Sequence, residues 1–235
     1  MGRALVGRMG TGAITIGLVL GLALGLGLAT GDAGASKSST KTALAHAKKQ
    51  LLKLSDMPKG WVSSKSSDGG SSFPGQNELA SCIGVPASTI KLNPPSSNSP
   101  EFGNKDETET VDDSISIFTS SKVAKSQYAA MANSKTPGCF AQILNGPSKK
   151  QLSSNFGAGA TVGTISVSRP SAPRSFTGFT LTFNVVDQGQ SIPVRLTEIV
   201  AIKGTEGLQL GFTAVENPFP SSLYKHLTSV ALARL

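Results

Sequence analysis

The clearest pattern in the chain is a period of two near its C-terminus. From Phe179 to Val185 apolar side chains alternate with polar ones, and a similar alternation returns over residues 192–202 and 208–214. Glycine-containing segments at 187–189 and 203–207 separate these runs. Short turns between alternating runs predict a three-stranded antiparallel meander, apolar on one face and carrying Thr, Gln and Arg on the other.

Helical periodicity flanks the domain at both ends. The first predicted helix has a stripe of four apolar residues, Leu44, Ala47, Leu51 and Leu54. We expect it to end at 55–56, because Pro58 disfavours helical geometry in the residue before it. The last helix is predicted to begin at Ser221 or Ser222 and to bury Leu223, Leu227, Val230 and Ala231.

The middle of the chain gives shorter patterns. Residues 78–83 predict a short helix ended by Gly84, and residues 111–118 predict a strand. Ser120 or Ser121 can cap a following helix, which we expect Pro137 to end. A further short helix is predicted at 139–144 and a strand at 161–168. The acidic segment at 106–113, DETETVDD, is interpreted as a solvated rim.

The chain contains two cysteines, Cys82 and Cys139. Two cysteines in an exported domain indicate one disulfide, and no C-x-x-C redox motif is present. Closing the loop between Cys82 and Cys139 stabilises the folded state by about 4 kcal/mol in the chain-entropy model.

The fold class predicted from these patterns is α+β: an antiparallel β-sheet, the C-terminal meander, covered by amphipathic helices and holding one disulfide. A sheet with one apolar face must be covered on that face, which predicts two layers. We expect a single domain over 44–235, preceded by a polar tether at 36–43.

The N-terminus is predicted to be a signal peptide over residues 1–35. Arg3 and Arg8 form a basic start, residues 14–28 are an uncharged apolar run, and residues 33–35 (AGA) give a small-x-small cleavage site. No cysteine precedes Cys82, so the chain lacks a lipidation site here. We therefore expect a secreted or extracytoplasmic protein. The alternative is membrane anchoring by an uncleaved signal anchor, because residues 13–29 approach the lower limit of about 17 residues for a span.

The formal net charge is +8. A basic exported protein is attracted to anionic lipid headgroups and phosphate-bearing wall polymers. No run of Lys and Arg exceeds two residues, and aromatic residues are not interleaved with them, which argues against nucleic-acid binding. The expected partners are an envelope lipid, a wall polymer or a small apolar ligand, bound by a monomer.

Catalytic and metal-binding patterns are weak in this sequence. The two histidines, His46 and His226, both lie on predicted polar helix faces, and no G-x-S-x-G nucleophile elbow occurs. With the cysteines paired, a zinc site of the usual kind lacks ligands. The glycine-rich segment at 157–163 leads into a strand instead of a helix, so it does not match a phosphate-binding loop. The sequence predicts no catalytic residue, metal ligand or cofactor.

A cavity on the sheet face is the most tenable binding site, and its candidate residues are Trp61, Arg195 and Glu198. Trp61, the only tryptophan, is interpreted as a core residue between the first helix and the sheet, with a ligand platform as the alternative. Arg195 and Glu198 point to opposite faces. Glu198 shares the apolar register, where a carboxylate needs a partner or a wet cavity, although a place at the sheet edge explains it equally well.

The segment at 54–61, LSDMPKGW, resembles the L-x-D-L-P-x-G-W motif of exported actinobacterial proteins. The order that follows also fits: a first cysteine with Gly84 after it, a strand ending in Phe118, an Ala-rich helix, a second cysteine and a meander. This arrangement looks like the extracellular sensor domain of mycobacterial receptor Ser/Thr kinases, over most of residues 44–233. Those domains typically carry two disulfides, whereas this chain can form one, and no ligand residue carries over.

Two functions follow as alternatives. The resemblance and the lack of catalytic motifs favour a non-catalytic extracytoplasmic binding or sensor-like module of the cell envelope, and no enzyme. The alternative is a secreted cell-envelope hydrolase whose site the sequence does not reveal. An uncommitted carboxylate pair near a cleft would favour the enzyme, and a closed apolar cavity would favour binding.

Overall fold

The computed structural model describes residues 37–64, 75–90, 94–146, 148–154, 156–157, 159–171, 173 and 175–235. The predicted signal peptide lies outside these residues. The helices are α1 (Lys37–Gln50), the 3-10 helix η2 (Leu54–Asp56), α2 (Gln76–Ile83), α3 (Ala87–Ile90), α4 (Ser121–Ala132), α5 (Thr136–Asn145), α6 (Lys149–Ser154) and α7 (Ser221–Arg234). No helix in the described part of the chain is both long and apolar enough to cross a membrane.

The strands form one antiparallel sheet in the order β1-β3-β4-β9-β8-β7-β5, with β2 paired to β4 and β6 paired to β7. Their bounds are β1 (Val62–Ser63), β2 (Ser96–Asn98), β3 (Phe102–Gly103), β4 (Glu109–Ile117), β5 (Thr161–Val162), β6 (Ser166–Ser168), β7 (Thr177–Asp187), β8 (Gln190–Lys203) and β9 (Glu206–Val215). The predicted meander is confirmed as β7-β8-β9, joined by turns at 188–189 and 204–205. The α+β prediction is therefore confirmed.

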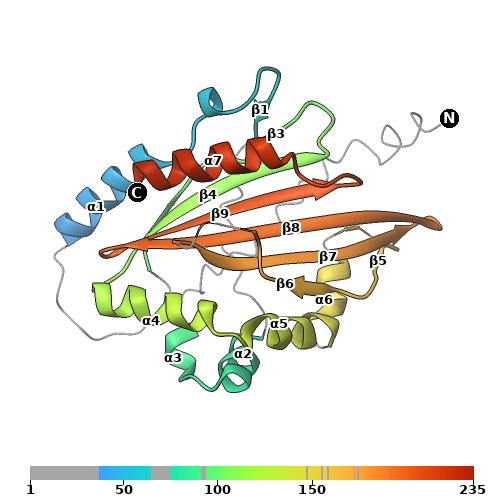
Figure 1. Ribbon diagram of the computed structural model, residues 1–235, viewed down its shortest axis with the longest axis horizontal. Coiled ribbons are helices and arrows are strands. Elements are labelled where there is room, and N and C mark those ends of the chain that lie inside the picture. The colour runs from blue at the N-terminus through green and yellow to red at the C-terminus, as the bar shows by residue number, and fades with distance from the viewer. Residues whose placement is uncertain are drawn as a thin grey trace.

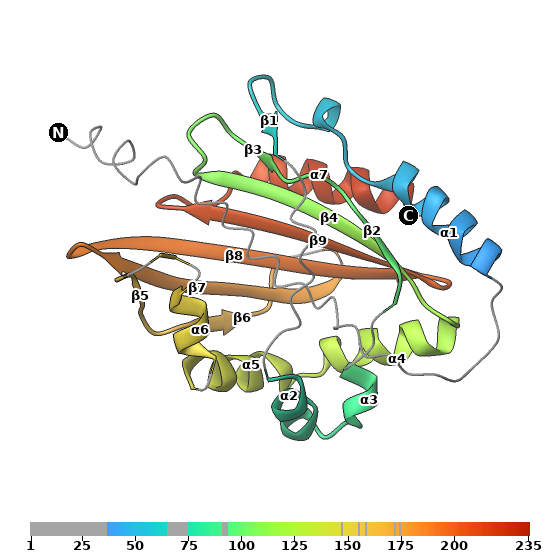
Figure 2. The ribbon, with the colours of Figure 1, turned by 180° about the vertical axis from the view of Figure 1, so that it is seen from behind.

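Helices cover both faces of the sheet, so the prediction of two layers was wrong. Figure 1 shows α1 and α7 along one side of the sheet and α2 to α6 along the other, and Figure 2 shows the same division from behind. The residues on β8 explain the difference, because Ile199 and Ala201 pack with α1 and α7, whereas Val194 and Leu196 pack with α2 and α5. Since neighbouring strand residues point to opposite faces, β8 has apolar residues on both.

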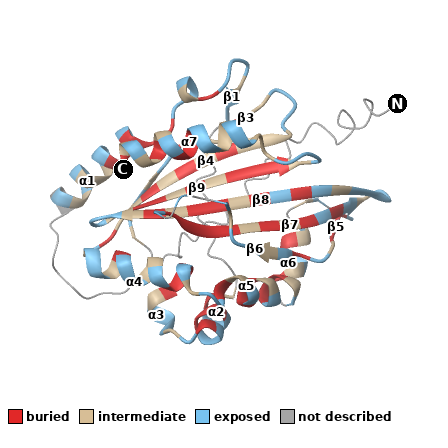
Figure 3. Ribbon diagram, viewed as in Figure 1, coloured by how far each residue is buried: buried red, intermediate tan, exposed pale blue. Residues whose placement is uncertain are grey.

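Two hydrophobic cores result, one on each face, and Figure 3 shows buried residues on both sides of the sheet. We call them the α7 core and the α5 core. The α7 core includes Ala47, Leu51, Val111, Ile115, Ile199, Leu208, Leu210, Phe212, Leu227 and Ala231. The α5 core includes Leu79, Ile83, Met131, Phe140, Ile143, Phe179, Leu181, Phe183, Val194 and Leu196.

The first helix differs from its prediction at both ends. It begins at Lys37, so most of the predicted polar tether is helical. It ends at Gln50, several residues early, and Leu54 is 44% exposed. The chain leaves the helix because the backbone N–H of Leu52 donates to both carboxylate oxygens of Asp113, at 3.2 Å each. Leu52 is buried in place of Leu54.

The helix predicted after Ser120 is confirmed, and the Ser120 hydroxyl accepts the N–H of Val123 at its N-terminus. It ends at Ala132, before Pro137, which lies in the first turn of α5 instead. Proline is tolerated there because its missing N–H would have no helical partner. The segment predicted as one strand at 161–168 forms two short strands, β5 and β6.

Two links join distant parts of the chain. The predicted disulfide between Cys82 and Cys139 is confirmed; it joins α2 to α5 with the two Cα atoms 5.9 Å apart. On the other face, the Arg234 guanidinium at the end of α7 donates to both carboxylate oxygens of Asp56, at 2.7 and 2.8 Å. Arg234 also donates to the Leu51 carbonyl at 3.1 Å. The two ends of the described chain are therefore held together on the α7 side.

Candidate functional site

The sheet carries a polar half on the face that α4 partly covers. Here β4, β9 and β8 lie side by side, and their register places residues directly opposite one another in rows that we call rungs. The rungs, each read from β4 through β9 to β8, are Ser116–Gly207–Ile202, Ser114–Gln209–Val200, Asp112–Gly211–Glu198 and Thr110–Thr213–Leu196. We call this surface the polar face. It contrasts with the α5 core, where β7 and β8 present Phe and Leu side chains.

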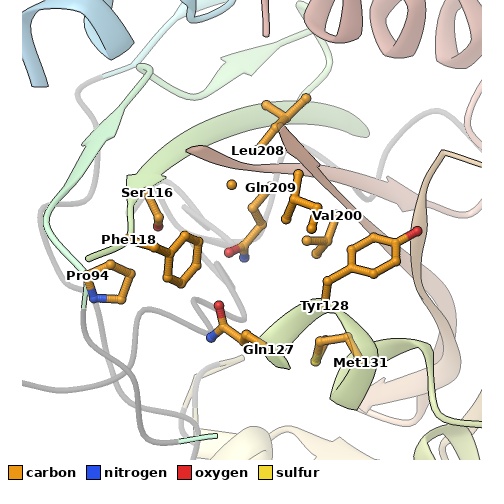
Figure 4. A pocket seen from close by; sticks show the side chains of 11 residues that line it. Pro94, Ser116, Phe118, Gln127, Tyr128, Met131, Val200, Leu208 and Gln209 are labelled. Carbon is orange, nitrogen blue, oxygen red and sulfur yellow. The ribbon is translucent and has the colours of Figure 1, made fainter. Parts of the chain in front are cut away.

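A small pocket lies at one end of the polar face, between the sheet and α4 (Figure 4). Its lining residues are Pro94, Ser116, Phe118, Gln127, Tyr128, Met131, Val200, Ile202, Gly207, Leu208 and Gln209. We call it the α4 pocket. Its volume of about 40 Å³ has room for water molecules or for a short apolar group. The amides of Gln127 and Gln209 point toward one another across it from α4 and β9.

The wall of this pocket depends on a glycine. A Cβ at position 207 would lie 2.6 Å from Cε2 of the Phe118 ring, closer than a carbon contact allows. Gly207 therefore lets the Phe118 ring rest against β9, where it is 7% exposed. The sequence pattern showed Gly207 only as part of a turn, and its role in shaping the pocket depends on the register of β9.

Next to the pocket, one rung brings carboxyl groups together, and we call it the carboxyl rung: Asp112, Gly211 and Glu198. The Cα atoms of the two acidic residues lie two strands apart, about 10 Å. Gly211 between them leaves room for the Asp112 side chain, since a Cβ there would lie 3.0 Å from the Asp112 Oδ1 atom. The Asp112 carboxylate thus leans over Gly211 toward Glu198.

A third carboxyl group stands at the outer end of this rung. In the register of β3 with β4, Phe102 lies opposite Val111, so Glu101, one residue earlier, continues toward Asp112. The charge of Glu101 raises the pKa of Asp112, which agrees with this placement. Three acidic side chains therefore gather across four neighbouring segments of the sheet.

Burial raises the pKa of each of these groups. The pKa of Glu198 rises from a usual 4.5 to about 8, because of burial first and then the charge of Asp112. The pKa of Asp112 rises from 3.8 to about 7, because of burial and then the charges of Glu101 and Asp113. Burial also raises the pKa of Glu101, against a hydrogen-bonding contribution from Thr110. At neutral pH this rung holds protons that free carboxyl groups would have released.

The carboxyl rung lacks partners within the described residues. Glu198 is 8% exposed, and its Oε1 atom has no hydrogen-bond partner there. Neither ion pair found among these residues involves Asp112 or Glu198, although the chain carries a formal net charge of +8. A buried carboxylate without a counter-charge is costly and takes up a proton or a cation. No group of three or more His, Cys, Asp or Glu in the described part could hold a metal ion.

The predicted site residues lie apart. Trp61 belongs to the α7 side, where its ring meets Phe219 edge-on at 6.3 Å, in line with a packing role. Arg195 is exposed, and its odd position in β8 places it on the face opposite Glu198. Of the three, Glu198 alone lies on the polar face. His46 and His226 are exposed as expected, and His46 Nδ1 lies 3.5 Å from Glu206 Oε1.

The interpretation of residues 106–113 as a solvated rim was wrong for its last two positions. Asp112 and Asp113 belong to β4, where Asp113 is 2% exposed and Asp112 is half-buried. The strand begins at Glu109, two residues before the predicted start at Val111, because β9 pairs with it that far. The register of β4 with β9 and of β9 with β8 brings Asp112 beside Glu198, a pairing that the sequence did not predict.

Comparison with known proteins adds little to these observations. No family model matches the chain, and no curated protein matches it. The chain is similar to a solved structure, the extracellular domain of PknH from Mycobacterium tuberculosis, with a TM-score of 0.36 and 8% sequence identity. The match covers 81% of this chain and 95% of that chain. A likeness this distant assigns no function, so the functional argument below depends on the residues of the site.

Proposed function

We propose that this protein is a non-catalytic extracytoplasmic binding module that takes a small ligand on the polar face beside α4. The observation that carries the proposal is Glu198, a buried carboxyl group whose Oε1 atom has no hydrogen-bond partner among the described residues, on the polar face beside the α4 pocket. Folded proteins pair most of their buried polar groups, and an unpartnered carboxyl oxygen close to a pocket supports a partner from outside the chain.

The disulfide supports the extracytoplasmic part of the proposal. Disulfides persist in oxidising compartments and are rare in the cytosol, and Cys82 and Cys139 are joined in a geometry that draws α2 and α5 together. Export by the predicted signal peptide would place the chain in such a compartment. Sequencing the N-terminus of the protein from the culture medium tests this: a start near Ser36 supports secretion, and an intact Met1 end in the membrane fraction supports anchoring.

An envelope hydrolase is the second candidate, and one observation favours it. Asp112 and Glu198 share a rung and have different pKa values, about 7 and about 8, and paired carboxyl groups of unequal proton affinity are what acid–base hydrolysis uses. Binding is nevertheless favoured, because the pKa values of both carboxyl groups are raised, whereas such an enzyme keeps one carboxylate ionised at neutral pH. Release of soluble fragments from purified wall polymer by the wild type, but not by Glu198→Gln, would favour the hydrolase.

Native mass spectrometry of the secreted protein tests binding directly. We expect the wild type to carry a co-purified small molecule that is released on denaturation. Ser116→Leu should abolish this adduct by filling the α4 pocket. Its matched control is Ser96→Leu, because Ser96 lies opposite Ser116 on β2 but is exposed and outside the pocket. An adduct that survives Ser116→Leu unchanged would place the ligand elsewhere and contradict the proposal.

A further inference from the structure

The carboxyl rung and the α4 pocket lie next to one another on the same face, and together they define a ligand with two different parts. The rung through Gln209 contributes to the pocket, and the next rung along β9 is the one that carries Asp112 and Glu198. Same-face residues on an antiparallel strand repeat at about 7 Å. A ligand of modest length could therefore contact both.

One end of this surface is acidic and lacks a counter-charge. Asp112, Glu198 and Glu101 contribute carboxyl groups, and no Lys or Arg of the described residues forms an ion pair with them. The neighbouring strand β7 presents Phe179 opposite Glu198. The Arg169 guanidinium lies 5.3 Å from the Phe179 ring, but it donates to the carbonyls of Met131, Asn133 and Gly178 and to the Thr177 hydroxyl. The lysines of α4, Lys122 and Lys125, are exposed. A ligand group that pairs with these carboxyl groups is therefore a cation that can also donate hydrogen bonds to them.

The other end, the α4 pocket, combines apolar carbon with the polar groups of Ser116, Gln127 and Gln209. Val200, Met131, Phe118 and the ring of Tyr128 line the α4 pocket, and Met131 is 4% exposed. Its volume of about 40 Å³ has room for a short apolar group. The burial of apolar carbon here would stabilise a bound ligand in proportion to the area removed from water.

Resting on the proposed function, we infer that the ligand class is a primary ammonium with a short alkyl stem: the ammonium lies between Asp112 and Glu198 over Gly211, and the stem lies in the α4 pocket. An ammonium offers three N–H donors, enough for both carboxylates and a neighbouring hydroxyl or amide. A calcium ion fits less well, because it takes six to eight oxygen ligands and leaves the α4 pocket unused.

Binding of such a cation is coupled to proton release. The ammonium pairs with ionised carboxylates, so the rung must give up the protons that it holds at neutral pH. Affinity therefore rises with pH through the range in which Asp112 and Glu198 titrate. A neutral ligand that hydrogen-bonds to protonated carboxyl groups would show the opposite trend, because it loses its donors as pH rises.

The test is an NMR titration of the full secreted protein with n-hexylammonium, with 1-hexanol as the matched neutral probe and calcium chloride as the inorganic cation. We expect amide shifts centred on Asp112, Gly211 and Glu198 with hexylammonium, and affinity at least roughly tenfold higher at about pH 9 than at about pH 6. Hexanol should bind roughly tenfold more weakly, and calcium should leave these amides unshifted.

Substitutions sharpen the result. Glu198→Gln and Asp112→Asn should each weaken hexylammonium binding by roughly tenfold and flatten its pH dependence. The matched control is Asp187→Asn at the far end of β7, which should change neither. Should either site variant fail to fold, the wild-type comparison of hexylammonium with hexanol decides the question alone.

The outcomes separate this inference from the proposed function. Equal binding of hexanol and hexylammonium on the polar face would overturn the ammonium assignment and leave a binding module. Shifts caused by calcium alone would overturn it in favour of a metal site. If no probe shifts the polar face while a co-purified adduct is lost in Ser116→Leu, the module binds a ligand of another class and the inference is wrong.

Discussion

Asp112 and Asp113 are consecutive residues of β4, and they meet opposite surroundings on the two faces of the sheet. Asp113 faces the α7 core, where both of its carboxylate oxygens accept the N–H of Leu52 and the charge of Arg234 lowers its pKa. Burial outweighs these effects and leaves the pKa of Asp113 at about 6. Asp112 lies on the polar face, on the opposite side of the sheet, where its neighbours are Glu101 and Glu198 and its pKa rises to about 7.

The difference shows how the same residue type can serve structure on one face and binding on the other. On the α7 side the chain supplies donors to its buried carboxylate, and the result is a link between α1, β4 and α7. On the α4 side Asp112 has glycines and further carboxyl groups as neighbours. The cost of burying ionised carboxylates there is therefore reduced only when a proton or a ligand binds. Four predictions test this contrast, in order of decreasing effect.

Removal of the disulfide should lower stability, and the loss of protection from hydrogen exchange should be confined to the side of the sheet that holds α2 and α5. Cys82→Ala with Cys139→Ala is expected to lower the free energy of unfolding by about 2–4 kcal/mol, because the unfolded chain regains a long loop. Hydrogen exchange should speed up in α2 and α5, while α1 and α7, held by Arg234 and Asp56, keep their protection. Equal loss of protection on both sides would show that the two cores do not separate as described.

Truncation of the two aspartates should give unequal effects. Asp113→Ala leaves the buried N–H of Leu52 without an acceptor, which costs about 1–3 kcal/mol of unfolding free energy. Asp112→Ala removes a carboxyl group that has no such donor, and we expect stability at about pH 8 to be unchanged or higher. Urea unfolding of both variants at that pH makes the comparison. Similar losses in both would mean that Asp112 has a structural partner after all.

The pH dependence of stability should have a definite sign. Glu198 and Asp112 have pKa values raised above their usual 4.5 and 3.8, so the folded state holds protons that the unfolded state has released. Their contribution to stability is therefore greatest below about pH 4 and falls as pH rises to about 8, above which it levels off. Asp56 acts in the opposite sense: Arg234 lowers its pKa, so its contribution is lost as pH falls below 3.8.

Thermal unfolding of the wild type and Glu198→Gln over this range measures the effect. The variant, which cannot ionise at position 198, should lose much of the decline between about pH 5 and 8 and melt above the wild type at the alkaline end. Asp187→Asn is the control and should follow the wild type. Parallel curves for all three proteins would remove Glu198 as the source of the decline.

The sequence predicted the meander well because strict alternation with glycine turns leaves one register that buries Phe179, Leu181 and Phe183 together. It predicted the disulfide from the cysteine count together with the expected export to an oxidising compartment. It also pointed to Glu198 as a carboxylate in an apolar register, which the structure bears out by its burial. These features depend on local alternation of apolar residues or on the pairing of two cysteines, and both can be read from the sequence.

Other features depend on contacts between distant segments. The run IVAI at 199–202 lacks alternation and, in retrospect, signals a strand buried on both faces, which is why helices lie on both sides of the sheet. The carboxyl rung needs the register of β4, β9 and β8 at once, together with Gly211 between its members. Trp61 and Arg195 were grouped with Glu198 on residue type, and the fold separates them.

The central claim is that the carboxyl rung holds protons at neutral pH because no residue of the described chain compensates its charge. Carboxyl carbon NMR of the ligand-free protein across about pH 3 to 10 tests it most directly. The account predicts that Glu198 titrates at about 8 and Asp112 at about 7. Asp56, paired with Arg234, should titrate below its usual 3.8 in the same spectra. Titration of Glu198 near its usual 4.5 would contradict the account.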